Sequence, residues 1–176
     1  QFRQMREETV LEKLLEQISA YELLNNLLPG ALLYALLSRH TGYQFKVDNV
    51  VLEIFIFYFI GLVAGRFGSL VIEPVYKKLG IINTADYKDF IAASKKDSKI
   101  EALSSKNNMY RTFIAVLVLY AIWRIVDWIV VIYPILRPWF IRIGVVLLIL
   151  LFSFSYRKQT KYVFDRINTQ IKNEGR

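Results

Sequence analysis

Residues 112–156 are TFIAVLVLYAIWRIVDWIVVIYPILRPWFIRIGVVLLILLFSFSY, two long apolar runs separated by a short turn at residues 133–138. The first run, 112–133, contains roughly the 20 residues that an apolar helix needs to cross a bilayer, and the second run, 139–156, is slightly shorter. We therefore predict a transmembrane helical hairpin within an all-α integral membrane protein.

Three charged residues lie inside these runs: Arg124 and Asp127 in the first, and Arg142 in the second. A charge at the bilayer centre costs from about 3 to over 10 kcal/mol by different measures, so each must face protein or trapped water. Arg124 and Asp127 share a helix face, and Asp127 and Arg142 lie at similar distances from the turn. Together with Glu53 of an earlier span, they predict a charge network that either holds the helices together or lines a pore.

The composition also indicates a membrane protein. The chain has 176 residues, of which 55% are hydrophobic, and its mean hydropathy is +0.32. These values are too apolar for an ordinary soluble domain and leave room for roughly three to five spans. Gln1 is not an initiator methionine, which leaves room for residues upstream.

Several kinds of catalytic site are disfavoured by the residue types present. The chain has no cysteine and only one histidine, His40, so it offers neither a thiolate nucleophile nor a histidine metal cluster. It also lacks a phosphate-binding glycine loop and a recognisable nucleophile motif. We therefore expect no enzyme activity, no cofactor and no metal site.

Upstream of the hairpin we predict an amphipathic cytosolic helix at residues 1–18 and two further spans, at about 20–38 and 50–72. Pro29 and Gly30 interrupt the first of these spans, which is either a kinked spanning helix or a partly re-entrant element. Pro74 is expected to end the second span.

Small residues recur at every fourth position in the second predicted span, at Gly61, Gly65 and Ser69. Small side chains at this spacing allow another helix to approach closely. The partner helix could belong to the same chain or to a second copy, so the pattern predicts helix packing, an oligomer contact, or both.

The polar segment 73–111 and the tail 157–176 are expected in the cytosol. A weak helical pattern at 84–103 predicts an amphipathic helix or a helical pair, and the last span continues into the tail as one long C-terminal helix. Segment 73–111 contains eight Lys and Arg residues and the tail contains six. The positive-inside rule then favours four spans with both termini in the cytoplasm.

Basic residues near the membrane have a second expected role. Arg66 lies near the cytosolic end of its span, where its long side chain can reach the interface. The lysines of segment 73–111 are expected to contact anionic lipid or, alternatively, a nucleotide or oligonucleotide activator; the candidates are Lys77, Lys78, Lys95 and Lys96. The sequence contains no dedicated DNA-recognition motif.

Three stretches resemble small multi-span membrane subunits of bacterial anti-phage defence systems of the Hailong or Kiwa type. They are residues 25–30 (NNLLPG), 61–74 (GLVAGRFGSLVIEP) and 107–112 (NNMYRT). The resemblance implies a homo-oligomeric effector of the bacterial inner membrane that alters membrane integrity when a partner senses infection. It assigns no role to an individual residue.

The function expected from these features is that of a homo-oligomeric channel or pore-forming effector. One alternative is a membrane anchor or sensor that recruits a soluble cytosolic partner through its basic loop and tail. A small dimeric transporter is a further alternative.

Overall fold

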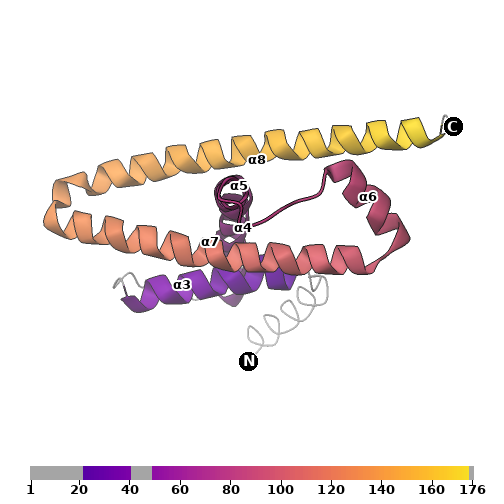
Figure 1. Ribbon diagram of the computed structural model, residues 1–176. Coiled ribbons are helices and arrows are strands. Elements are labelled where there is room, and N and C mark those ends of the chain that lie inside the picture. The colour runs from indigo at the N-terminus through magenta and orange to yellow at the C-terminus, as the bar shows by residue number, and fades with distance from the viewer. Residues whose placement is uncertain (1–21, 41–48, 175–176) are drawn as a thin grey trace, which may run out of the picture.

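The computed structural model describes residues 22–40 and 49–174, and all regular structure within them is helical (Figure 1). This confirms the predicted all-α class, whereas the helix predicted at 1–18 lies outside the described residues. The elements are η1 (Leu23–Leu27), α3 (Leu28–His40), α4 (Val50–Phe67), η2 (Gly68–Ile72), α5 (Glu73–Lys78), α6 (Tyr87–Lys96), α7 (Lys99–Ile132), η3 (Pro134–Leu136) and α8 (Arg137–Glu174).

Three of the described helices are long and apolar enough to cross a membrane: Val50–Lys78, Lys99–Ile132 and Pro134–Asn168. They support membrane insertion. The first predicted span, 20–38, is represented in the described residues by η1 and α3. With 5 residues in η1 and 13 in α3, this continuous helix is about 27 Å long, slightly shorter than the roughly 30 Å hydrocarbon core of a bilayer.

Two prolines lie inside continuous helix because the turn before each of them widens. Pro74 does not end its helix as predicted: η2 and α5 extend α4 without a break to Lys78. A proline in a helix removes one N–H donor and its ring clashes with the carbonyl four residues earlier. The five-residue π-helix η2 precedes Pro74, and the π-helix η1 precedes Pro29 in the same way. A π-turn inserts an extra residue, which accounts for the uninterrupted helix at both sites.

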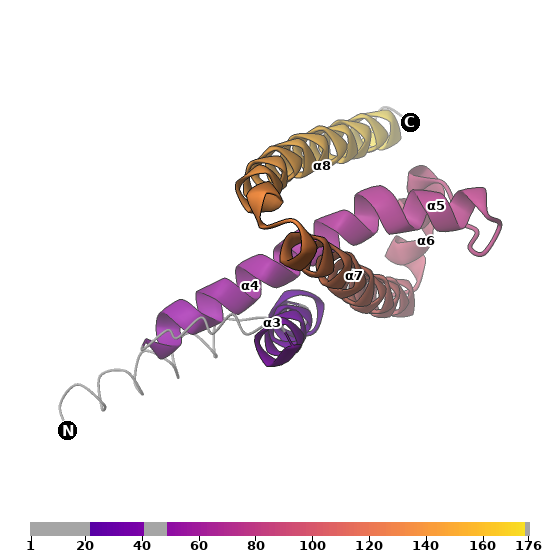
Figure 2. The same ribbon diagram turned by 90° about the vertical axis from the view of Figure 1, so that its left-hand side faces the viewer.

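The predicted hairpin is formed by α7 and α8. The backbone N–H of Tyr133 donates to the Ile129 carbonyl at 2.8 Å, and Pro134 opens the single turn η3 before α8 starts. The two helices run antiparallel but stand apart, and α4 crosses between them (Figures 1 and 2). Helix α4 therefore does not lie alongside the hairpin, and one copy does not form a set of aligned spans.

The polar segment 73–111 is largely helical. Helix α6 and the start of α7 form a helical pair that is broken at Asp97 and Ser98, where the Asp97 carboxylate accepts the Lys99 N–H at 2.9 Å. Tyr87 of α6 stacks on Tyr162 of α8, with ring centroids 4.9 Å apart. Helix α6 thereby connects the start of α7 with the C-terminal part of α8, at the ends of these helices that are farthest from the hairpin turn.

The best-packed region lies where α3, α4 and α7 cross, around the buried side chains of Leu33, Ala64 and Val116. Glycine allows the backbones to touch here. A Cβ atom on Gly61 would overlap the backbone of Asn26, and one on Gly30 would overlap the backbone of Phe57. The close approach through Gly61 is thus made within one chain.

Gly61→Ala should strongly destabilise this crossing, since neither backbone can move away without separating the helices. Overpacking of this kind typically costs about 1–3 kcal/mol, and backbone overlap should bring the cost to the upper end. The matched control is Gly144→Ala in α8, where an added Cβ would meet no atom within 4 Å. Thermal unfolding of both variants in detergent checks the prediction, and equal stability of the two would contradict it.

Candidate functional site

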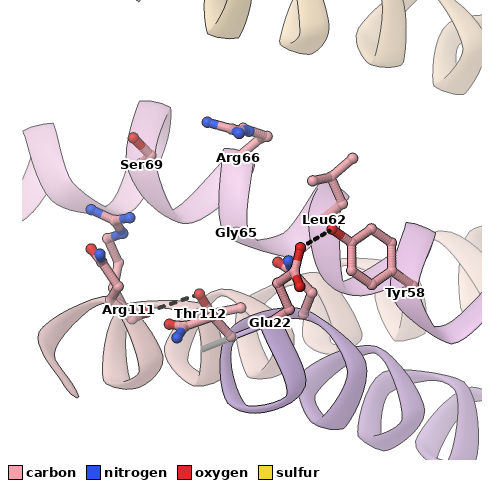
Figure 3. A pocket seen from close by; sticks show the side chains of 11 residues that line it. Glu22, Tyr58, Leu62, Gly65, Arg66, Ser69, Arg111 and Thr112 are labelled. Atoms are coloured by element: carbon pink, nitrogen blue, oxygen red, sulfur yellow. Dashed lines mark hydrogen bonds between the residues drawn. The ribbon is translucent and has the colours of Figure 1, made fainter. Parts of the chain in front are cut away.

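A polar cavity of about 430 Å³ lies between η1, α4 and α7, next to the packed crossing (Figure 3). Four elements supply its polar lining: Asn25 and Asn26 come from η1, Arg66 from α4, Ser69 from η2, and Asn108 and Arg111 from α7. Gly65 also lines the cavity, and a Cβ atom there would lie in ordinary van der Waals contact with Thr112 Oγ1, at 3.7 Å. A cavity lined mainly by polar groups is suited to water or a polar ligand.

Glu22 and Tyr58 close one side of this cavity. The Tyr58 hydroxyl donates to Glu22 Oε1 at 3.4 Å, a long contact that joins the start of the described chain to α4 (Figure 3). Arg66 leaves α4 on the side away from Glu22, whereas Arg111 rises from α7 toward Ser69 (Figure 3). Arg111 therefore lies at the Ser69 end of the cavity, opposite the Glu22–Tyr58 contact, and Arg66 lies on the far face of α4 (Figure 3).

Three cations surround the carboxylate of Glu73, just beyond that end. Arg111 donates from Nη1 to Glu73 Oε2, Lys77 Nζ lies 2.9 Å from Oε1, and Lys158 Nζ lies 3.8 Å from Oε2. Only 16% of the Glu73 side chain is exposed. We call Glu73, Lys77, Arg111 and Lys158 the Glu73 cluster.

Lys158 also links the cluster to the cavity wall. Its ammonium group donates to the carbonyl oxygen of Ser69 at 3.0 Å and to Ser69 Oγ at 2.7 Å, and it lies 5.8 Å from the ring centroid of Tyr162. The charges of Arg111, Lys77 and Arg66 all act on this ammonium group. Four cations thus lie in the part of the molecule that joins α4–α5, α7 and α8, and three of them surround the Glu73 carboxylate.

The charges predicted to form one intramembrane network are only partly brought together. Arg124 Nη1 lies 3.6 Å from Asp127 Oδ2, so these two residues form the expected pair on α7. Arg142 instead lies over the ring of Trp139, 5.2 Å from its centroid. Glu53 is in the first turn of α4, and that end of the helix lies away from α7 and α8 (Figure 2).

The predicted lysine set is also dispersed. Lys77 belongs to the Glu73 cluster, whereas Lys78 is exposed at the end of α5. Lys95 Nζ contacts Gln170 Oε1 at 3.3 Å, and Lys96 is exposed at the end of α6. Among the small residues, Gly61 makes the close crossing, while Gly65 and Ser69 line the cavity.

Sequence reasoning did not select Glu73, Arg111 or Lys158. Their shared signal was position, because each lies within two residues of an end of a predicted span: 50–72, 112–133 or 139–156. On the predicted topology these three ends face the same side of the membrane. Charged residues at span ends on one side of the membrane are therefore a signal from which this cluster could have been predicted.

A scan against models of known protein families, a search of curated proteins and a search of solved structures each find no match to this chain.

Proposed function

We propose that this protein is a homo-oligomeric membrane channel or pore-forming effector, in which the α7–α8 hairpins of several copies surround a hydrated path. The observation that supports this most strongly is the exposure of charge within the apolar hairpin. Arg124 is 46% exposed in a single copy, its partner Asp127 is 22% exposed, and Arg142 is exposed on α8. Charges at such positions cannot face lipid without a large cost.

The hairpin exposes apolar as well as charged side chains, and the two kinds need different surroundings in a membrane. Its exposed residues include Leu117, Trp128, Val131, Ile141 and Leu147. Lipid can cover apolar side chains, but only protein or water can cover the charged ones. In a ring of several hairpins, the apolar residues would face lipid and neighbouring copies, and the charged residues would face a shared interior.

The resemblance to subunits of Hailong- or Kiwa-type defence systems fits an effector of this kind. On that basis we place the protein in a bacterial inner membrane and propose that a cytosolic partner, or a nucleotide or oligonucleotide, controls it. The partner or nucleotide would bind the basic surface of segment 73–111 and the tail, since both are rich in Lys and Arg.

The oligomer is tested by mass. In nanodiscs, the particle should contain several copies of the 20.6 kDa chain. Native mass spectrometry counts the copies directly. A uniform population with one copy per disc, at protein concentrations that would favour association, would contradict the proposal and favour the anchor or sensor alternative.

Membrane topology is the second test. The sequence contains no cysteine, so a thiol reagent will label only the cysteine that is introduced. With four spans and cytoplasmic termini, Arg39→Cys and Ile135→Cys should react with an impermeant thiol reagent outside intact cells, whereas Lys96→Cys and Arg166→Cys should be protected.

Two other labelling patterns would contradict the four-span arrangement. If α4 lies across the hairpin without spanning, Arg39→Cys will be protected together with Lys96→Cys, and only Ile135→Cys will react. If η1 and α3 are re-entrant with the N-terminus inside, Lys96→Cys and Arg166→Cys will react, and Arg39→Cys and Ile135→Cys will not.

A further inference from the structure

We propose that the Glu73 cluster and the adjoining polar cavity form a binding site for a phosphate group. Its excess of positive charge is the first observation. Arg66, Lys77, Arg111 and Lys158 together have four positive charges; the Glu73 carboxylate neutralises one of them, and Glu22, at the other end of the cavity, a second. Cations held close together repel one another, so an anion added beside them is stabilised.

Donor groups at the cavity wall are the second observation. Arg66, Ser69, Asn108 and Arg111 all line the cavity. The Nε atom of Arg111 is buried and has no hydrogen-bond partner within the described ranges 22–40 and 49–174. An unpaired buried donor is costly, and phosphate oxygens are strong acceptors for arginine N–H groups. The guanidinium keeps its bond to Glu73 through Nη1, and Nε is the donor that this bond leaves for an added anion.

The size and position of the site decide which phosphates to test. A volume of about 430 Å³ has room for a phosphate-bearing headgroup or a small soluble phosphate compound. Glu73, Arg111 and Lys158 lie at the ends of predicted spans, where the headgroups of anionic lipids are also found. Both sources offer the same chemistry, namely phosphate oxygens that accept hydrogen bonds from arginine and lysine.

The test uses the full chain and two probes. Inorganic pyrophosphate is titrated into protein in neutral detergent, with isothermal calorimetry as the readout. Retention of phosphatidylglycerol is compared with that of phosphatidylcholine by native mass spectrometry from mixed nanodiscs. Binding of pyrophosphate without selective lipid retention identifies a soluble ligand, and selective retention of phosphatidylglycerol identifies a headgroup. If neither probe binds, the proposal is overturned.

Two variants and one control make the result specific to this site. Arg66→Gln and Lys158→Gln should each weaken binding of the active probe about tenfold, because each removes a charge-assisted contact. The control Lys96→Gln changes net charge equally at an exposed position on α6 and should leave affinity unchanged. An equal loss in Lys96→Gln would mean diffuse attraction and would overturn the proposal.

The Glu73→Gln variant gives a result of opposite sign. Without the Glu73 carboxylate, the cations of the cluster interact with the added anion only, so the probe that binds should bind more tightly. It should also raise the melting temperature of this variant more than that of the wild-type protein. Since every readout is binding or stability, these results are independent of whether the protein conducts ions. A smaller rise in melting temperature for a folded Glu73→Gln protein would contradict an anion site at the cluster.

Discussion

Glu73→Gln should destabilise the protein more than any other single removal of a charge among the residues of the cavity and cluster. The Glu73 carboxylate pairs with Lys77, Arg111 and Lys158, which come from α5, α7 and α8. Removing one partner of a buried ion pair typically costs about 3–5 kcal/mol because the other charge is left uncompensated. We expect about 3 kcal/mol here, since Arg111 and Lys158 keep 26% and 28% of their side chains exposed.

Thermal unfolding in detergent measures this loss. For a chain of this length, about 3 kcal/mol corresponds to a fall in melting temperature of roughly 6–12 °C. The matched control is Glu101→Gln, at an exposed position in the first turn of α7, where the helix dipole contributes only about 0.5 kcal/mol. Equal melting temperatures for the two variants would show that the Glu73 cluster does not hold the helices together.

A double-mutant cycle separates the ion pair from other effects of the substitution. If Glu73 acts mainly through Arg111, Glu73→Gln combined with Arg111→Gln should cost clearly less than the two single changes added together. Additive losses would instead indicate that the two residues act independently.

Asp127→Asn should leave the oligomer assembled and shift its ion selectivity toward anions. In a hydrated path, water stabilises Arg124 after its partner loses charge, and the path becomes more positive by one unit per copy. If the pair is a buried structural contact between copies, Asp127→Ala should instead cost about 3–5 kcal/mol and separate the oligomer.

The comparison of assembly with selectivity distinguishes these roles. Oligomer mass is measured by native mass spectrometry and selectivity by the reversal potential in a salt gradient. Asp89→Asn, at an exposed position in the first turn of α6, is the control with the same chemical change outside the hairpin. Unchanged mass and unchanged reversal potential for both Asp127 variants would mean that Asp127 has neither role.

Local features of the fold could be predicted well from the sequence. The apolar runs at 112–133 and 139–156 predict the α7–α8 hairpin, and the residues between them form its turn. The Asn49 side chain accepts the Leu52 N–H at 3.1 Å and marks the start of α4, close to the predicted start of that span at residue 50. Apolar runs and helix caps depend on residues that are close together in the sequence, so the sequence alone is enough to predict them.

Other features depended on contacts that are distant in sequence. Glu73 and Arg111 are 38 positions apart, and Ser69 and Lys158 are 89 apart, so nothing local showed that they would meet. The incorrect helix end at Pro74 has a local cause instead. The general rule that proline ends a helix does not allow for the π-turn at Gly68–Ile72, which no recognised sequence pattern predicts.

Current recording across a planar bilayer containing the purified protein is the most direct test of a hydrated path between hairpins. The bilayer contains phosphatidylglycerol and is recorded with and without inorganic pyrophosphate, after native mass spectrometry has established the copy number. A channel predicts discrete current steps, with a reversal potential in a KCl gradient that shifts in Asp127→Asn. A bilayer that stays impermeable under both conditions, although inserted oligomer is present, would contradict it.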